Sequence, residues 1–245
     1  MSILIVACLG CMLCFILFIL SGLFNHSILP IKPVKELPIV SVVIAARNEE
    51  MFIGDLIQDL INQEYPLEKL EVIIVNDRST DTTNEILTTA NENYALIKTI
   101  KVDKTSENMT PKKNALTLGI ESAGGEIIIL TDADCRVGKL WVSSMVYSVI
   151  NQNCISIGFS EIGLNTNSLF EKYQRIDFLG IISANAGSAG WGHFWSGTGQ
   201  NLAFYKEDFF KINGFEPVKD RISGDDMYLV QSISKLKKGY INIDP

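Results

Sequence analysis

The chain has 245 residues, 47% of them hydrophobic, and carries a net charge of −7 because 28 acidic side chains outnumber 21 basic ones. This length and apolar content are sufficient for one large α/β domain or two small ones. The sequence contains no basic run that would track a phosphate backbone, so the composition argues against a nucleic-acid partner.

The first part of the chain is its most hydrophobic segment. Residues 3–24 (ILIVACLGCMLCFILFILSGLF) contain no charged side chain and are long enough to cross a bilayer as one helix. Residues 5–8 (IVAC) resemble a lipoprotein cleavage site, but no basic residue precedes the segment and it continues well beyond Cys8. We therefore predict a retained transmembrane helix over residues 1–24 rather than a cleaved signal.

A proline-containing segment, residues 25–38 (NHSILPIKPVKELP), follows this helix and predicts an extended linker. Lys32 and Lys35 are the first Lys or Arg residues of the chain, and the positive-inside rule places everything after them in the cytoplasm. Only Cys135 and Cys154 follow the helix, and two isolated thiols fit a reducing compartment. We expect a membrane protein with a cytoplasmic domain.

From residue 39 onward, apolar strands alternate with helices. The pattern predicts strands over residues 39–46, 71–76, 97–102 and 126–131, and helices over residues 52–61, 80–93 and 111–122. This alternation is typical of a mostly parallel sheet with helices on both faces, so the fold class is α/β and Rossmann-like.

The later part of the chain is less regular. It predicts helices over residues 140–150, 169–183, 207–212 and 227–236, and a short strand over residues 201–205. Residues 183–201 (SANAGSAGWGHFWSGTGQN) predict a glycine-rich loop with embedded aromatic residues. Residues 239–245 (GYINIDP) indicate the start of a strand with no helix to cover it, so we expect the chain to be a fragment.

Three polar loops follow predicted strands directly: AARNEE, NDRSTD and TDADCR. Parallel sheets bind ligands at the carboxyl ends of their strands, so these loops should bring their side chains to one edge. Asp132 and Asp134 flank the small Ala133, and two carboxylates so spaced can reach one Mg²⁺ or Mn²⁺ ion. An ordinary polar turn is the alternative interpretation of this motif.

Four further candidates carry an alternative each. The Asp77 carboxylate could accept hydrogen bonds from a ribose or from the edge of a base, or it could be an acidic residue favoured by the dipole at a helix N-terminus. Lys112 opens a helix, where a cation indicates a nearby anion or is simply solvated. One aspartate of the pair Asp225 and Asp226 could act as a general base, because adjacent like charges raise the pKa of one of them. The alternative is that the pair caps a helix. Trp195 could stack on a sugar ring or pack in the core.

In their order and spacing, PIVSVVIAARNEE, VIIVNDRSTDTT, KKNALTLGI, IILTDADCRV, GTGQNLAFYKEDFFKINGF and SGDDMYLV resemble the family 2 glycosyltransferases with the GT-A fold. The resemblance covers nearly everything from residue 38 onward. It implies a GT-A domain over residues 39–245, with a nucleotide-sugar-binding half over residues 39–137 and an acceptor-side half over residues 138–245.

The same resemblance implies a metal-dependent, inverting enzyme that moves a sugar from a nucleotide-sugar, usually a UDP-sugar, to a glycan or lipid-linked acceptor. Asp132 and Asp134 match the family's metal motif, and Asp226, preceded by Asp225, matches its catalytic base. The residues matching the donor site are Ala45, Arg47, Glu49, Asp77 and Lys112. Those matching the acceptor-side segment are Gly197, Thr198, Gly199, Gln200 and Asn201.

Two other classes of protein compete with this interpretation. A sugar-1-phosphate nucleotidyltransferase normally opens with a glycine-rich phosphate loop, but AARNEE contains no glycine. A non-catalytic, membrane-anchored nucleotide-sugar-binding protein or inactive fragment stays open, because the chain ends abruptly at GYINIDP, before any Q-x-x-R-W motif of the kind that the family's processive synthases carry.

Overall fold

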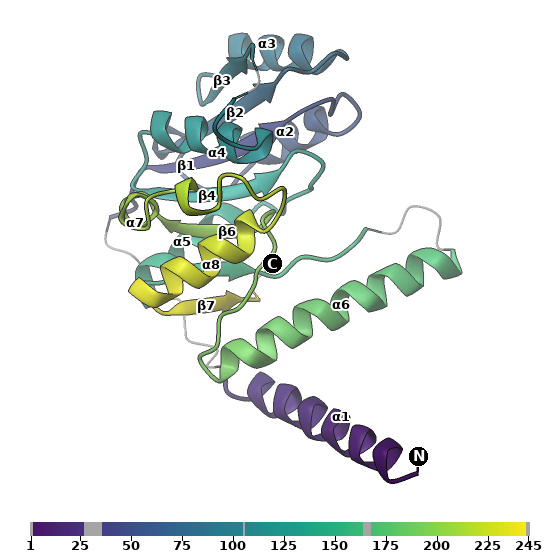
Figure 1. The fold of residues 1–245 in the computed structure, drawn as a ribbon. Coiled ribbons are helices and arrows are strands. Elements are labelled where there is room, and N and C mark those ends of the chain that lie inside the picture. The colour runs from purple at the N-terminus through teal and green to yellow at the C-terminus, as the bar shows by residue number, and fades with distance from the viewer. Residues whose placement is uncertain (1, 27–35, 105, 164–167, 244–245) are drawn as a thin grey trace.

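The computed structural model describes residues 2–26, 36–104, 106–163 and 168–243. Their strands form one seven-stranded sheet in the order β3-β2-β1-β4-β6-β5-β7 (Figure 1). The strands are β1 Val40–Ala46, β2 Leu70–Asp77, β3 Ile97–Val102, β4 Ile127–Asp132, β5 Ile155–Gly158, β6 Leu202–Tyr205 and β7 Gly239–Asn242. The α-helices are α1 Ser2–Leu23, α2 Ile53–Ile61, α3 Thr83–Asn93, α4 Pro111–Ser122, α5 Trp141–Gln152, α6 Leu169–Gly190, α7 Lys206–Lys211 and α8 Asp225–Leu236. Two 3-10 helices, η1 Leu67–Lys69 and η2 Glu216–Val218, complete the elements.

The first four strands are parallel, as the sequence predicts. β1 lies between β2 and β4, with Val40 opposite both Leu70 and Ile127, and β3 extends the sheet beyond β2. Every residue of β2 is buried, because helices cover both faces. The predicted α/β class is confirmed.

Two apolar cores lie on opposite faces of the sheet. Val42 and Ile44 of β1 pack with residues of α2, α3 and α5, whereas Val43 packs with residues of α4, α7 and α8. Alternate residues of a strand point to opposite faces, so one β-branched run supplies both cores. This rigid sandwich fixes the loops at the carboxyl ends of the strands.

Two features of the second half differ from the sequence prediction. Strand β5 was not predicted; it pairs antiparallel with β6 and parallel with β7. Helix α6 continues to Gly190, so the predicted glycine-rich loop is helical over its first eight residues, 183–190. The predicted terminal strand is present as β7.

Close packing against α1 explains why α6 continues through small residues. A Cβ atom on Gly187 would lie 2.4 Å from the carbonyl oxygen of Ile19, and one on Gly190 would lie 1.9 Å from that of Gly22. Only glycine allows this approach, and the contact offsets glycine's low helix propensity. Helix α1 itself contains one segment, residues Leu4–Leu23, long and apolar enough to cross a membrane. Residues 27–35 of the predicted linker lie outside the described residues, as do Lys32 and Lys35.

Candidate active site

A cavity of about 340 Å³ lies at the carboxyl ends of β1, β2 and β4. Its walls combine the three polar loops with the first turn of α4, as the parallel topology predicts. The lining residues are Ala45, Ala46, Arg47, Glu49, Asp77, Pro111, Lys112, Ala115, Asp132, Ala133 and Asp134. Every residue predicted for the donor and metal sites is in this set.

The loops after β1 and β2 are bonded to each other. Asn48 and Arg78 both adopt left-handed backbone conformations, with φ of 57°, which turn the chain sharply at the strand ends. The Thr80 amide donates to Asn48 Oδ1 at 2.8 Å, and the Glu49 amide donates to Thr83 Oγ1 at 2.8 Å. These bonds hold Glu49 at the cavity, and they explain why α3 begins at Thr83 rather than at residue 80.

The carboxylate of Asp77 is buried and held by its neighbour. Arg78 donates from Nε to Asp77 Oδ1 at 2.8 Å and from a terminal nitrogen to Oδ2 at 3.0 Å. This two-point bond fixes the plane of the carboxylate at the cavity wall. Nothing in the sequence pattern marks Arg78 as a supporting residue.

Lys112 is bonded to the metal motif and is influenced by the charges of the base motif. Its Nζ donates to Asp132 Oδ1 at 2.7 Å. Burial alone would lower the pKa of Lys112, but the charges of Asp132, Asp225 and Asp226 raise it above its ordinary value. The lysine therefore carries a positive charge that faces both motifs. The anion that the sequence indicated beside it is, in the protein alone, the Asp132 carboxylate.

Negative charge is concentrated at the end of β4. Burial, followed by the charges of Asp134, Asp132 and Asp81, raises the pKa of Glu49. The described residues contain no group of three or more His, Cys, Asp or Glu side chains arranged around a metal position. Mg²⁺ is usually held by one or two carboxylates together with substrate phosphates, so the pair Asp132 and Asp134 fits such an ion in chemistry and number.

Arg136 secures the loop that carries these two aspartates. It donates to both carboxylate oxygens of Asp59 on α2, at 2.6 and 2.9 Å, and to Asp55 at 3.2 Å. The Val137 amide adds a bond to Asp59 at 3.2 Å. These contacts fix the chain just after Asp134, and the sequence pattern alone does not indicate them.

The segment GTGQN, residues 197–201, contacts Asp226 and the loop that carries the metal motif. A Cβ atom on Gly199 would lie 3.4 Å from Cβ of Asp226, which is an ordinary van der Waals contact, so the segment packs against Asp226. Gln200 accepts a weak bond from the thiol of Cys135 at 3.7 Å. Burial, then the charges of Asp132 and Asp134, raise the pKa of that thiol to about 11, so it stays protonated.

Asp225 and Asp226 are the first two residues of α8, which follows Gly224 in a left-handed conformation with φ of 83°. Asp226 Oδ1 accepts from the Met227 amide at 2.7 Å. Burial and the charge of Asp225 raise the pKa of Asp226, although the Met227 and Gly199 amides and Lys112 oppose this. A carboxylate with a raised pKa is a better proton acceptor than an ordinary aspartate.

Other predicted acceptor-side residues have structural contacts. Gly197 is buried, and a Cβ there would lie 3.0 Å from Ile157. The side-chain amide of Asn201 accepts a hydrogen bond from Trp141 Nε1 through Oδ1 at 2.9 Å and donates one from Nδ2 to the Phe159 carbonyl at 2.8 Å. Asn201 therefore holds the segment in place. By contrast, Thr198 Oγ1 is buried without a partner among the described residues.

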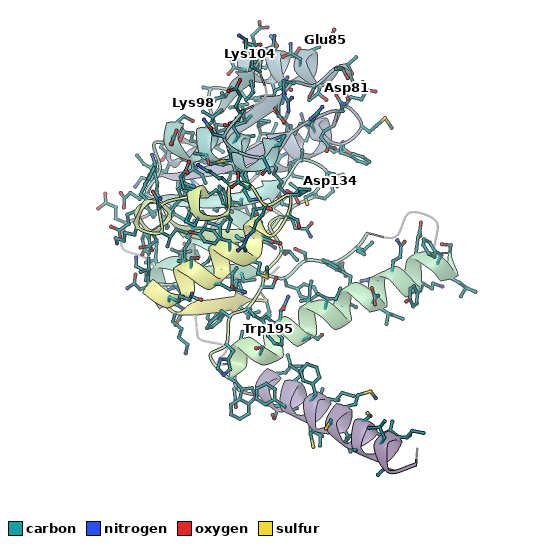
Figure 2. The ribbon with its side chains drawn as sticks, viewed as in Figure 1. Asp81, Glu85, Lys98, Lys104, Asp134 and Trp195 are labelled. Carbon is teal, nitrogen blue, oxygen red and sulfur yellow. The ribbon has the colours of Figure 1, made fainter. Side chains whose placement is uncertain are left out.

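Trp195 lies outside the cavity. Its indole nitrogen donates to Asn185 Oδ1 of α6 at 2.6 Å, and Figure 2 shows it beside α6, well separated from Asp134. Its exposed fraction is 40%. Its predicted role in stacking on a sugar stays a prediction.

Comparison with known proteins identifies the family. A model described as "Glycosyl transferase family 2" matches residues 41–218. The chain belongs to this family. It is 30% identical over 186 residues to a probable glycosyltransferase, YdaM, of Bacillus subtilis, covering 75% of this chain and 44% of that protein. It is also 39% identical over 103 residues to a beta-monoglucosyldiacylglycerol synthase of Nostoc, covering 42% of this chain and 22% of that protein. The chain thus spans less than half the length of these relatives.

Solved structures confirm the GT-A fold. A mannosyltransferase from Pyrobaculum calidifontis, solved with GDP-Man and Mn²⁺, superposes with a TM-score of 0.73 at 19% identity, covering 94% of this family 2 chain and 62% of that one. TarS of S. aureus superposes with a TM-score of 0.60 at 17% identity, covering 84% and 58%.

Proposed function

We propose that the protein transfers a sugar from a nucleotide-sugar to a hydroxyl of a glycan or lipid-linked acceptor, with inversion at the anomeric carbon. The observation that carries this proposal is the position of Lys112. Its cation is bonded to Asp132 of the metal motif and is close enough to Asp225 and Asp226 to feel their charges, which supports placing the donor and the base in one site.

The donor would bind in the cavity at the strand ends. Asp77 would accept from the nucleoside, and Lys112 would contact the diphosphate. Asp132 and Asp134 would hold Mg²⁺ or Mn²⁺, which when bound supplies positive charge to the departing diphosphate. UDP is our first choice of nucleotide, although one structural neighbour was solved with UDP and another with GDP-Man.

Asp226 would act as the base. As the acceptor oxygen forms its bond to the anomeric carbon, the bond from that carbon to the diphosphate breaks and the hydroxyl proton passes to Asp226. The carboxylate must therefore be ionised before the reaction, and its raised pKa increases its proton affinity. A single displacement of this kind inverts the anomeric centre.

The acceptor would be reached at a membrane. Helix α1 has the length and composition of a spanning segment, and the relative from Nostoc is named for the synthesis of a glucosyl lipid. We propose that α1 anchors the protein with the GT-A domain in the cytoplasm. This arrangement suits an acceptor that is itself lipid-linked.

Two substitutions separate donor binding from chemistry. Asp134→Asn should abolish the metal-dependent part of UDP binding, measured by calorimetry with and without Mn²⁺. Asp226→Asn should leave that binding intact and stop transfer to a membrane extract. Asp220→Asn, at an exposed aspartate near α8, is the matched control.

Unchanged UDP and Mn²⁺ affinity in the Asp134 variant would refute the metal assignment. Binding without transfer in the unmodified protein, across UDP- and GDP-sugars, would instead favour a non-catalytic nucleotide-sugar-binding protein.

A further inference from the structure

Helix α6 exposes an unusual amount of apolar surface for a helix of a folded domain. Leu169 is 86% exposed, Phe170 68%, Tyr173 65% and Ile176 69%. Four large apolar side chains within two turns of one helix form a contiguous patch of the kind that marks an interaction site.

Three of these residues belong to one face, which ends on α1. Leu169, Tyr173, Ile176, Gly180 and Gly187 follow each other at steps of four, three, four and seven residues, so they share one side of the helix. We call Leu169, Tyr173 and Ile176 the apolar stripe. At the far end of the same face, Gly187 lies directly against the backbone of α1 at Ile19.

The contact between α1 and α6 is close and specific. Gly22 of α1 lies against Gly187 and Gly190, Trp191 stacks on Phe18 with ring centroids 5.6 Å apart, and Trp191 Nε1 donates to the Phe18 carbonyl at 3.0 Å. The two helices meet at their carboxyl ends and diverge towards their amino ends, with α6 between α1 and the sheet (Figure 1). The apolar stripe is therefore on the side of α6 that receives α1.

We propose that the apolar stripe of α6 rests in the surface of the lipid bilayer that α1 spans. The inference rests on the membrane anchor in the proposed function. Lipid is the occupant that the geometry favours, because any bilayer surrounding α1 would continue along the face of α6 to which α1 is attached. Amphipathic helices that lie in the interface bury their apolar face in this way.

The charges of α6 indicate which lipid property matters. Glu171 and Asp177 balance Lys172 and Arg175, and no Asp, Glu, Lys or Arg occurs between Phe178 and Tyr205. A helix without net charge gains little from anionic headgroups, so insertion of apolar side chains should supply the attraction and zwitterionic lipid should suffice.

A membrane-bound α6 would fix the distance between the membrane surface and the acceptor side of the proposed site. Residues 191–201 follow α6 directly, Trp195 is bonded back to Asn185 of α6, and Gly199 of the same segment lies against Asp226. The base would then be tied to the membrane surface through a short segment. A lipid-linked hydroxyl could reach it without leaving the bilayer.

Photochemical crosslinking tests the contact without any need for activity. The photoreactive amino acid p-benzoylphenylalanine replaces Ile176 in the full chain, reconstituted in phosphatidylcholine nanodiscs, and adducts are identified by mass spectrometry after irradiation. The matched control carries it in place of Gln174, an exposed residue about 160° away round the same helix. Position 176 should give several-fold more lipid adduct than position 174.

Equal lipid yields at the two positions would overturn the proposal, as would adducts at position 176 formed mainly with a second copy of the chain. If the substitution at position 176 perturbs folding, p-benzoylphenylalanine is placed instead at Tyr173, with Arg175 as its control position, and the lipid yields of these two are compared. Because no donor or acceptor is present, a missing lipid adduct refutes the α6 contact and leaves the proposed transfer reaction untouched.

Discussion

Replacing Lys112 by methionine removes the cation that connects the two halves of the site. Methionine keeps much of the length and apolar stem of lysine, so the substitution removes charge with little change in packing. Lys112 Nζ lies 2.7 Å from Asp132 Oδ1, and the two side chains are 47% and 32% exposed.

The exposure of this ion pair sets the expected effect on stability. An ion pair so open to solvent contributes only about 0.2 to 1 kcal/mol, so the free energy of unfolding of Lys112→Met should stay within about 1 kcal/mol of the parent. A hydrogen bond to a charged group is worth about 1.5 to 3 kcal/mol. If Lys112 contacts the diphosphate, the Kd for UDP should therefore rise about ten- to 150-fold.

Calorimetric titration of UDP in the presence of Mn²⁺ measures this change in the detergent-solubilised protein, and GDP is titrated in parallel. Lys101→Met is the matched control, because Lys101 is an exposed lysine that pairs with Asp103 at 3.6 Å on the outer strand β3. A change in Kd no larger for Lys112→Met than for Lys101→Met would refute the placement of the diphosphate at Lys112.

Two further predictions concern the scaffold of the site. Asp59→Ala removes the acceptor of three bonds from the loop after β4 and should lower the free energy of unfolding by about 1 to 2 kcal/mol, measured by guanidinium denaturation. Arg136 lowers the pKa of Asp59, so this stability is present above the ordinary aspartate pKa and is lost as the pH falls. Gly125→Ala would place a Cβ 2.6 Å from the Ser41 amide nitrogen and should destabilise by about 1 to 3 kcal/mol; an unchanged denaturation midpoint would contradict that packing.

Strands β1, β2 and β4 were predictable from local sequence because they are β-branched runs buried on both faces. β1 and β4 each lie between two other strands of the sheet, and such runs have few other ways to bury their side chains. The position of the donor-side residues followed from topology alone, since parallel strands end at one edge.

The parts that were missed depend on partners distant in sequence. β5 has only four residues, and its strand conformation comes from pairing with β6 and β7. Helix α6 continues past residue 183 because Gly187 packs on α1, a contact that the glycine-rich sequence by itself does not indicate.

The same reasoning applies to the residues that support the site. Arg78 and Arg136 act through carboxylates, one adjacent in sequence and the other on α2. The motifs NDRSTD and TDADCR contain these two arginines, but the motifs do not show in which direction the arginine side chains point. Side-chain direction depends on turns such as the left-handed one at Arg78, which is uncommon for residues other than glycine.

In the proposed mechanism, Lys112 would also couple donor binding to the proton affinity of Asp226. Its charge lowers the pKa of Asp226, while burial and Asp225 raise it. A diphosphate bound at Lys112 would offset part of that charge, so Asp226 should become a stronger proton acceptor once the donor is present. Lys112→Met removes the lowering influence permanently, so the acid limb of the pH–rate profile should move to higher pH than in the parent, because a higher pKa keeps Asp226 protonated up to a higher pH. Transfer rates at donor concentrations well below KM, which report the pKa of the free enzyme, measure this shift, with Lys101→Met as control; an unmoved acid limb would show that Lys112 and Asp226 do not interact in the free enzyme.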